Sequence, residues 1–201
     1  PERIFEFNPN ACFIYIMRDP VKRTISHYWH NVRWHSEHRD ILKAIQQDHG
    51  YLAVSHYAMQ LKPFINLFGM DRLFTTTFEE FTTQIETNLK MIFKWLGVSP
   101  VFQFPNSVLT ENVTPGIIEQ AREYGVLNRF RYSSLWGTIY KAFPSDLRRL
   151  GKKLALKNVD RERIDVDSVL EYLRPIQMEQ TKELENMLSR KFPEWTTLHE
   201  K

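Results

Sequence analysis

The chain has 201 residues, of which 42% are hydrophobic and 25% charged, proportions typical of a soluble globular protein with a single core. We therefore expect one domain over residues 1–201. The longest apolar run, residues 11–17, is far shorter than the ~20 residues of a membrane-spanning helix, so no membrane span is predicted. A net charge of +3 is too small for a general nucleic-acid binder but allows one local anionic site.

The cysteine and glycine content excludes an internal disulfide and the glycine-rich phosphate-binding motifs. The single cysteine, Cys12, cannot form an internal disulfide and lies in the apolar run as a small buried hydrophobe would, which favours a reducing, cytoplasmic compartment. The two closest glycines, Gly116 and Gly125, are nine residues apart, so neither GxGxxG nor GxxxxGK[ST] occurs. No glycine loop that cradles a phosphate lies within these residues.

The first predicted elements are a strand and a helix. Residues 3–7 look like the end of an element already under way. The apolar run 12–17 predicts a strand buried on both faces of a parallel sheet. Asp19 is a favoured N-cap and Pro20 a favoured first helical residue, so a helix is expected from there to about Ser36.

The same alternation continues along the chain. An apolar stripe predicts a helix over residues 57–68 that ends at Gly69, and a strand follows over residues 73–78. A third helix is expected over residues 81–96, closed by Gly97. Two βα units in succession predict an α/β fold with a parallel sheet flanked by helices.

The second half of the chain is less regular. Residues 98–131 are predicted to be mostly loop, with a short helix near residues 117–124. Helices are expected over residues 134–156, with a break at Pro144, and over residues 167–191.

Arg18 and Ser26 are the strongest candidate site residues. Arg18 follows the first strand, at the sheet edge where α/β proteins bind ligands. Ser26 lies seven residues after Asp19, two helical turns on, and therefore on the same helix face. A guanidinium and a hydroxyl beside a helix N-terminus form a plausible phosphate clamp. On spacing alone the commoner arrangement is that Arg18 pairs with Asp19 or another carboxylate and Ser26 bonds its own helix backbone.

The stretch over residues 13–30, which contains Arg18-Asp-Pro-Val-Lys-Arg-Thr-Ile-Ser26-His-Tyr, closely resembles the 3′-phosphate-binding motif of sulfotransferases that use 3′-phosphoadenosine 5′-phosphosulfate (PAPS). It looks most like the bacterial branch, which is related to the heparan sulfotransferases. In that family an arginine after the strand and a serine eight residues later hold the 3′-phosphate, and Arg18 and Ser26 have this spacing. Further similarity runs through residues 57–64, 68–74 and 77–81, the helix ending at Gly97, and Phe192-Pro-Glu-Trp195.

The resemblance implies a P-loop-NTPase-like α/β fold and a PAPS-dependent sulfotransferase that moves a sulfuryl group to an acceptor hydroxyl or amine. The implied product is 3′-phosphoadenosine 5′-phosphate (PAP), and no metal is needed. Phe78 stands where the family has an aromatic residue, usually tyrosine, near the adenine. A plain core residue is an equally good interpretation of Phe78. The acceptor stays open between a small molecule, a lipid and a carbohydrate, and the sequence does not indicate an oligomeric state.

The chain also departs from the family pattern. The second phosphate loop, with its lysine, and the general base of the family lie upstream of the motif, and the glycine count excludes such a loop here. We therefore expect a partial domain that lacks the N-terminal phosphate-loop unit, and we assign no catalytic residue. If these 201 residues are the whole molecule, no transfer activity and only weak nucleotide binding are expected.

Two rival functions remain. One is a non-catalytic, degenerate module of the same fold that binds a partner through aromatic and basic helix faces. The other is half of an adenylate-type kinase or ATPase, which would bind ATP in a Mg²⁺-dependent way.

Several secondary sites have plainer interpretations. His27, His30, His35 and His38 fall on one face of the predicted helix, but as two pairs too far apart for one ion, so no metal site is predicted. Ser55 and Tyr57 are candidates for acceptor contact, although Tyr57 also fits a core stripe. Arg129 and Arg131 are the nearest candidates for a basic segment that covers the donor, although a solvated basic surface is the commoner interpretation. The later basic cluster is interpreted as a solvated helix face rather than a binding patch; it comprises Arg148, Arg149, Lys152 and Lys153.

Overall fold

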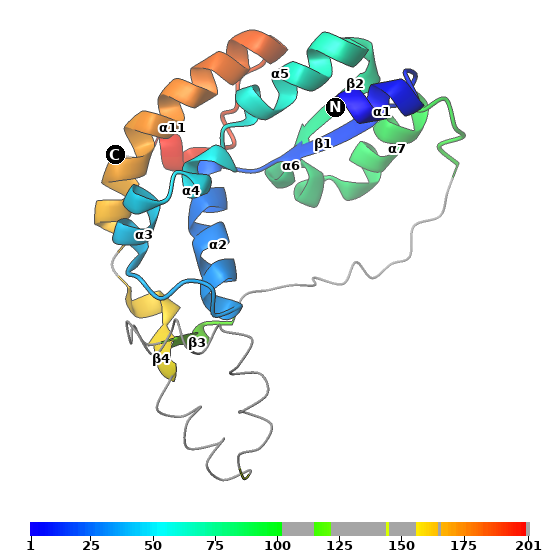
Figure 1. Ribbon diagram of the computed structural model, residues 1–201. Helices are drawn as coiled ribbons and strands as arrows, with labels where there is room; N and C mark the ends of the chain where they lie inside the picture. Colours follow the sequence, from blue (N-terminus) through cyan, green and yellow to red (C-terminus); the bar gives the residue numbers. More distant parts are fainter. Residues whose placement is uncertain (102–114, 122–143, 145–155, 165, 200–201) are drawn as a thin grey trace. The chain divides into compact units, whose positions relative to one another are not determined.

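The computed structural model describes residues 1–101, 115–121, 144, 156–164 and 166–199 (Figure 1). The chain divides into two compact units. The first comprises Pro1–Ile25, Gly50–Glu111 and Asp167–Lys201, and the second comprises Ser26–His49 and Asn112–Val166. Within the described ranges, no helix combines the length and apolar character that a membrane span requires.

A parallel strand pair forms the centre of the first unit. Strand β1 (Phe13–Met17) pairs with β2 (Leu73–Thr77) in a register that sets Phe13 beside Leu73 and Met17 beside Thr77. The carboxyl ends of both strands therefore lie at the same sheet edge. The helices that follow each strand, α2 (Pro20–Arg33) and α6 (Phe78–Thr83), both begin at this edge. The predicted parallel βα arrangement is confirmed.

The other elements of the first unit are helical, and α5 and α11 lie side by side (Figure 1). They are α1 (Glu2–Phe7), α4 (Gly50–Ala53), α5 (Tyr57–Phe68), η1 (Met70–Arg72), α7 (Ile85–Trp95), α11 (Asp167–Leu188) and η3 (Thr196–Leu198).

Helix α5 covers one face of β1. The ring of Phe13 packs edge-on against those of Phe64 and Phe68, with centroids 5.1 and 4.6 Å apart. The alternate side chains of the strand, Ile14 and Ile16, are 45% and 49% exposed. The prediction of a strand buried on both faces was therefore wrong, because successive side chains point to opposite faces and only the face toward α5 is well covered.

The C-terminal segment completes the core of the first unit. Helix α11 buries Val169, Leu173 and Leu184. After it, the ring of Phe192 stacks on that of Trp195 with centroids 4.1 Å apart. The helix ends three residues earlier than predicted, and Ser189 follows with a positive φ of 50°.

The second unit contains the rest of α2, α3 (Ile41–Gln47), the antiparallel strands β3 (Ile117–Ala121) and β4 (Leu156–Asp160), and η2 (Arg161–Arg163). A polar cluster joins its parts. The hydroxyl of Tyr28 on α2 donates to the Arg39 carbonyl at 2.8 Å, and the Gln120 amide of β3 donates to both oxygens at 3.3 Å.

Three sequence-based expectations are corrected. The short helix near residues 117–124 is strand β3, because residues 117–121 pair with the distant β4. The third helix divides into α6 and α7 at Gln84, whose φ of −134° is not helical. Leu156 begins β4, and the rest of the helix predicted over residues 134–156 falls outside the described residues, apart from Pro144.

Candidate functional site

Arg18 lies directly after β1, and side chains from two other elements hold its backbone. The Tyr57 hydroxyl of α5 donates to the Arg18 carbonyl at 2.8 Å and accepts from the Arg18 amide at 3.2 Å. The next amide, that of Asp19, donates to Oε1 of Glu79 on α6 at 3.1 Å. The main chain at the carboxyl end of β1 is thus fixed by hydrogen bonds on both sides of the Arg18 side chain.

The guanidinium of Arg18, in contrast, makes no ion pair or hydrogen bond with any residue that the structure describes. The guanidinium instead lies over the ring of Phe78, whose centroid is 5.4 Å from Cζ. The side chain is half-buried. Among the described residues Arg18 pairs with neither Asp19 nor another carboxylate, and the five N–H donors of its guanidinium are available there to an anion.

The Asp19 carboxylate accepts four hydrogen bonds from groups other than Arg18. Oδ1 accepts from the amides of Val21 and Lys22, both at 3.1 Å, which is the predicted N-cap of α2. The Thr197 hydroxyl of η3 donates to Oδ1 at 2.6 Å and the Thr197 amide to Oδ2 at 3.2 Å. The fully buried Asp19 thus joins the start of α2 to the C-terminal turn.

Ser26 lies on α2, at the first residue of the second unit. The hydrogen bond to the helix backbone that was considered for Ser26 is made by Thr24 instead. The Thr24 hydroxyl donates to the Pro20 carbonyl at 2.9 Å and lies 2.9 Å from the Ser55 hydroxyl. The half-buried Ser26 makes no such bond within the described part of the chain, so its hydroxyl is free to bind a ligand.

Phe78 is the first residue of α6 rather than the last residue of β2, and its side chain is 46% exposed. This exposure rules out the interpretation as a plain core residue. The ring lies at the same sheet edge as Arg18, where its face and the guanidinium attract each other.

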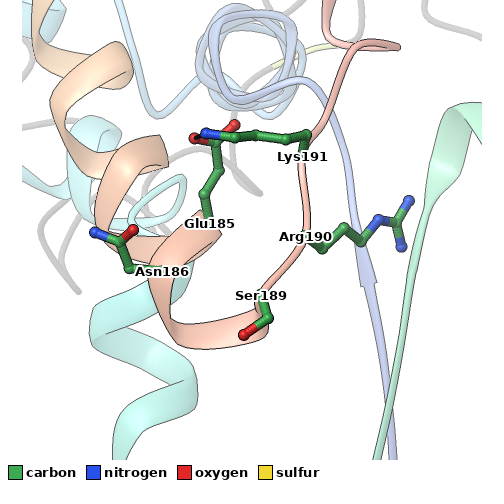
Figure 2. Close-up of a pocket in the computed structure, with 5 residues that line it drawn as sticks. All are labelled: Glu185, Asn186, Ser189, Arg190 and Lys191. Carbon is green, nitrogen blue, oxygen red and sulfur yellow. Dashed lines mark hydrogen bonds and ion pairs between the residues drawn. The ribbon is translucent and has the colours of Figure 1, made fainter.

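The cations of the pocket in Figure 2 differ from Arg18 because both are paired. The pocket has a volume of about 270 Å³ and lies at the end of α11, where Lys191 extends alongside Glu185 and Arg190 points the other way. Lys191 binds Glu185 at 2.6 Å, and Arg190 binds Glu80 at 2.6 Å and Glu194 at 3.0 Å. This pocket is therefore a poor candidate for an anion site.

Burial raises the pKa of two tyrosines, Tyr15 within β1 and Tyr57 on α5. Desolvation raises the pKa of Tyr15 to about 12, although the charge of Arg23 opposes this. Burial likewise raises the pKa of Tyr57 well above its usual range, again against the charge of Arg23. At neutral pH the Tyr57 hydroxyl therefore keeps the proton that it donates to the Arg18 carbonyl.

The remaining candidate residues are buried, exposed before β1, or outside the described part of the chain. Ser55 and Tyr57 are buried, which favours the interpretation of Tyr57 as a core residue. Cys12 is exposed just before β1, so the expectation of a buried thiol was wrong. Arg129, Arg131, Arg148, Arg149, Lys152 and Lys153 lie outside the described residues.

The four histidines do not share one helix. Helix α2 ends at Arg33, and His35, with a positive φ of 58°, lies in the turn beyond it. Among the residues that the structure describes, no group of three or more His, Cys, Asp or Glu side chains is arranged to hold a metal ion.

Sequence reasoning did not predict how Tyr57, Glu79 and Thr197 contact the backbone of Arg18 and the carboxylate and amide of Asp19, because Tyr57 was considered only for acceptor contact or as a core residue. The three residues lie 39 residues from Arg18 and 60 and 178 residues from Asp19 along the chain. A pattern in one sequence gives no sign of contacts at such separations.

Comparisons with known proteins identify the family and the fold of this chain. Residues 2–102 match the sequence profile of the sulfotransferase family. A crystal structure of a sulfotransferase from Alicyclobacillus acidocaldarius has a similar fold, with a TM-score of 0.63 and 19% sequence identity. The similarity covers 97% of this chain and 61% of that chain, so this chain spans about three fifths of its length. This structural similarity confirms the predicted P-loop-like α/β fold. A search of curated proteins gives no significant match.

Proposed function

The chain belongs to the sulfotransferase family, and from that membership we propose that it binds PAPS through Arg18 and Ser26, which hold the 3′-phosphate. One observation carries the proposal. The Arg18 guanidinium lies at the carboxyl edge of a parallel strand pair with no carboxylate or hydrogen-bond partner in the described structure. An unpaired, half-buried cation on a fixed backbone is what an anion site needs.

Ser26 completes the proposed clamp. It follows Asp19, the N-cap of α2, by seven residues, which is two turns of a continuous helix and returns it to the face of the cap. A dianionic phosphate would take a forked pair of bonds from Arg18 and one bond from Ser26, and the positive end of the helix favours the same charge.

The clamp explains donor selection rather than catalysis. The 3′-phosphate distinguishes PAPS from other adenine nucleotides, and it lies away from the sulfuryl group. In the proposed reaction the S–O bond to the 5′-phosphate breaks, a new bond forms from sulfur to an acceptor oxygen or nitrogen, the acceptor loses its proton, and PAP departs. By analogy with phosphoryl transfer, this step depends chiefly on positioning and electrostatics. No catalytic residue is assigned within these 201 residues.

Phe78 is proposed to flank the adenine. Its 46% exposed ring keeps a face for stacking, although it lacks the hydroxyl that the family usually has at this position. The proposed acceptor is a hydroxyl or amine of a small molecule, lipid or carbohydrate. The free thiol of Cys12, exposed at the surface, supports a reducing compartment such as the cytoplasm.

Calorimetric titration of the natural full-length chain tests the proposal. PAP is compared with 5′-AMP, which lacks the 3′-phosphate, and with ATP, each with Mg²⁺ and with EDTA. We expect micromolar binding of PAP that EDTA does not change, and binding of 5′-AMP that is at least tenfold weaker. Tighter, Mg²⁺-dependent binding of ATP would favour the kinase or ATPase interpretation. Equally feeble binding of all three would favour the partner-binding module.

A further inference from the structure

The backbone on either side of the Arg18 side chain is held by side chains rather than by the sheet. The β1–β2 ladder ends at the pair Met17 and Thr77. Beyond it, the amide and carbonyl of Arg18 both bond the Tyr57 hydroxyl, and the amide of Asp19 bonds Glu79. Tyr57 comes from α5 and Glu79 from α6, so two separate elements fix three consecutive backbone groups.

These hydrogen bonds fix the backbone around Arg18 but do not involve its side chain. Buried backbone groups need partners, and here all three find them without using the guanidinium of Arg18. The side chain therefore starts from an anchored Cα but keeps its own donors uncommitted. Binding of an anion therefore costs less conformational entropy of the protein than binding to an arginine on a mobile loop would.

We infer that Tyr57 and Glu79 are positioning residues: they hold the Arg18 backbone so that the guanidinium is presented to the 3′-phosphate. The inference rests on the proposed function, because it concerns the same anion. Neither residue is required to touch the nucleotide, and each acts through Arg18.

The surroundings of Tyr57 allow a clean test of its hydroxyl. The side chain is 5% exposed, and its ring packs against those of Trp195 and Tyr15 at centroid distances of 5.8 and 6.1 Å. These contacts keep the ring in place in a Tyr57→Phe variant, which loses only the two bonds to Arg18. Tyr15→Phe is the matched control, since the Tyr15 hydroxyl donates to Gln60 at 2.7 Å and does not touch Arg18.

The experiment is a double-mutant cycle on PAP affinity in the full chain, with folding of each variant checked by circular dichroism. Tyr57→Phe should weaken PAP binding by three- to tenfold, whereas Tyr15→Phe should change it by less than twofold. In an Arg18→Ala background, Tyr57→Phe should have almost no further effect. Independent effects of Tyr57→Phe and Arg18→Ala would overturn the inference, because Tyr57 would then act directly or through general stability.

Glu79 provides a second test that does not depend on the folding of Tyr57→Phe. Glu79→Gln keeps an oxygen that can accept from the Asp19 amide, whereas Glu79→Leu removes it, and both remove the charge. The Glu79→Leu variant should therefore bind PAP at least threefold more weakly than Glu79→Gln. Equal affinities of these two variants would remove Glu79 from the inference.

The outcomes also separate this inference from the proposed function. If Arg18→Ala leaves PAP affinity unchanged, or if the unaltered chain does not bind PAP, the proposed function fails and the inference fails with it. If Arg18→Ala weakens binding but Tyr57→Phe and Glu79→Leu do not, the proposed function stands and only the positioning role is refuted.

Discussion

Arg18 and Arg190 show that the partners of a cation, rather than its exposure, decide whether it can bind a ligand. Both arginines are partly buried in the first unit and both lie against a phenylalanine ring. Arg190 is held by two carboxylates, those of Glu80 and Glu194. The carboxylate nearest to Arg18 in sequence, Asp19, is taken by the start of α2 and by Thr197. An anion reaching Arg18 therefore displaces no ion pair formed among the described residues.

Removing the hydroxyl of Ser26 should affect PAP binding, whereas removing that of Thr24, also on α2, should affect stability. Ser26→Ala should weaken PAP binding about tenfold, because a hydrogen bond to a charged group contributes about 1.5–3 kcal/mol. It should leave the free energy of unfolding almost unchanged, since its hydroxyl has no partner in the described structure. Thr24→Val should leave PAP binding almost unchanged and lower the free energy of unfolding by about 1–2 kcal/mol, because it leaves the Ser55 hydroxyl without its partner. Calorimetry and urea unfolding of both variants check this, and loss of stability in Ser26→Ala would contradict it.

Tyr15 predicts how stability depends on alkaline pH. Its pKa is about 12 in the folded chain, against an ordinary value of 10.0. Between these values the unfolded chain loses the proton and the folded chain keeps it, so stability is fully present below pH 10 and falls as the pH rises toward 12. Urea midpoints measured across this range should decline less steeply for Tyr15→Phe than for the unaltered chain. Identical slopes would show that the folded-state pKa of Tyr15 is not raised.

At the scale of elements, α11 carries a buried amide with no partner. Gln177 is 0% exposed, and neither atom of its amide bonds another described group. A buried amide without a partner costs about 1–3 kcal/mol. Gln177→Leu should therefore raise the free energy of unfolding, as measured with urea.

The same substitution on α5 provides the control for Gln177. The amide of Gln60 accepts from Tyr15 and donates to the Ala53 carbonyl. Gln60→Leu should therefore destabilise the chain by about 1–3 kcal/mol. If Gln177→Leu and Gln60→Leu were equally destabilising, Gln177 would have a partner after all.

The attachment of η3 to α2 is a second property of elements. Thr197→Val removes the 2.6 Å hydrogen bond to the Asp19 carboxylate and keeps the shape of the side chain. It should lower the free energy of unfolding by about 1.5–3 kcal/mol. Thr197→Ser keeps the hydroxyl and should restore most of the loss. Thermal or urea unfolding measures both variants, and an undiminished stability of Thr197→Val would show that this contact does not hold the C-terminal turn.

Elements with local signals were predictable from sequence, and elements defined by distant partners were not. Asp19 and Pro20 marked the start of α2, and Gly69 and Gly97, with positive φ values of 81° and 73°, marked helix ends. Strand β3 carried no such signal. Its conformation depends on pairing with β4, which lies more than thirty residues further along the chain.

At the scale of the whole molecule, the family and the parallel βα arrangement followed from the sequence because one motif spans a strand, a turn and a helix. Arg18 and Ser26 were singled out by their position and spacing, and the family likeness then assigned them a role and added Phe78. The contacts that leave the Arg18 guanidinium available were not predicted, since Tyr57, Glu79 and Thr197 reach this edge from α5, α6 and η3. A sequence motif thus identified the candidate ligand residues, and the fold supplied their support.

The most direct test of the account is the difference between PAP and 5′-AMP affinity in the unaltered chain and in Arg18→Ala. Arg3→Ala, which removes an exposed arginine of α1, is the control for net charge. Calorimetry should show that the unaltered chain and Arg3→Ala prefer PAP at least tenfold, and that Arg18→Ala loses most of this preference. A preference for PAP that survives in Arg18→Ala would contradict the central claim that Arg18 binds the 3′-phosphate.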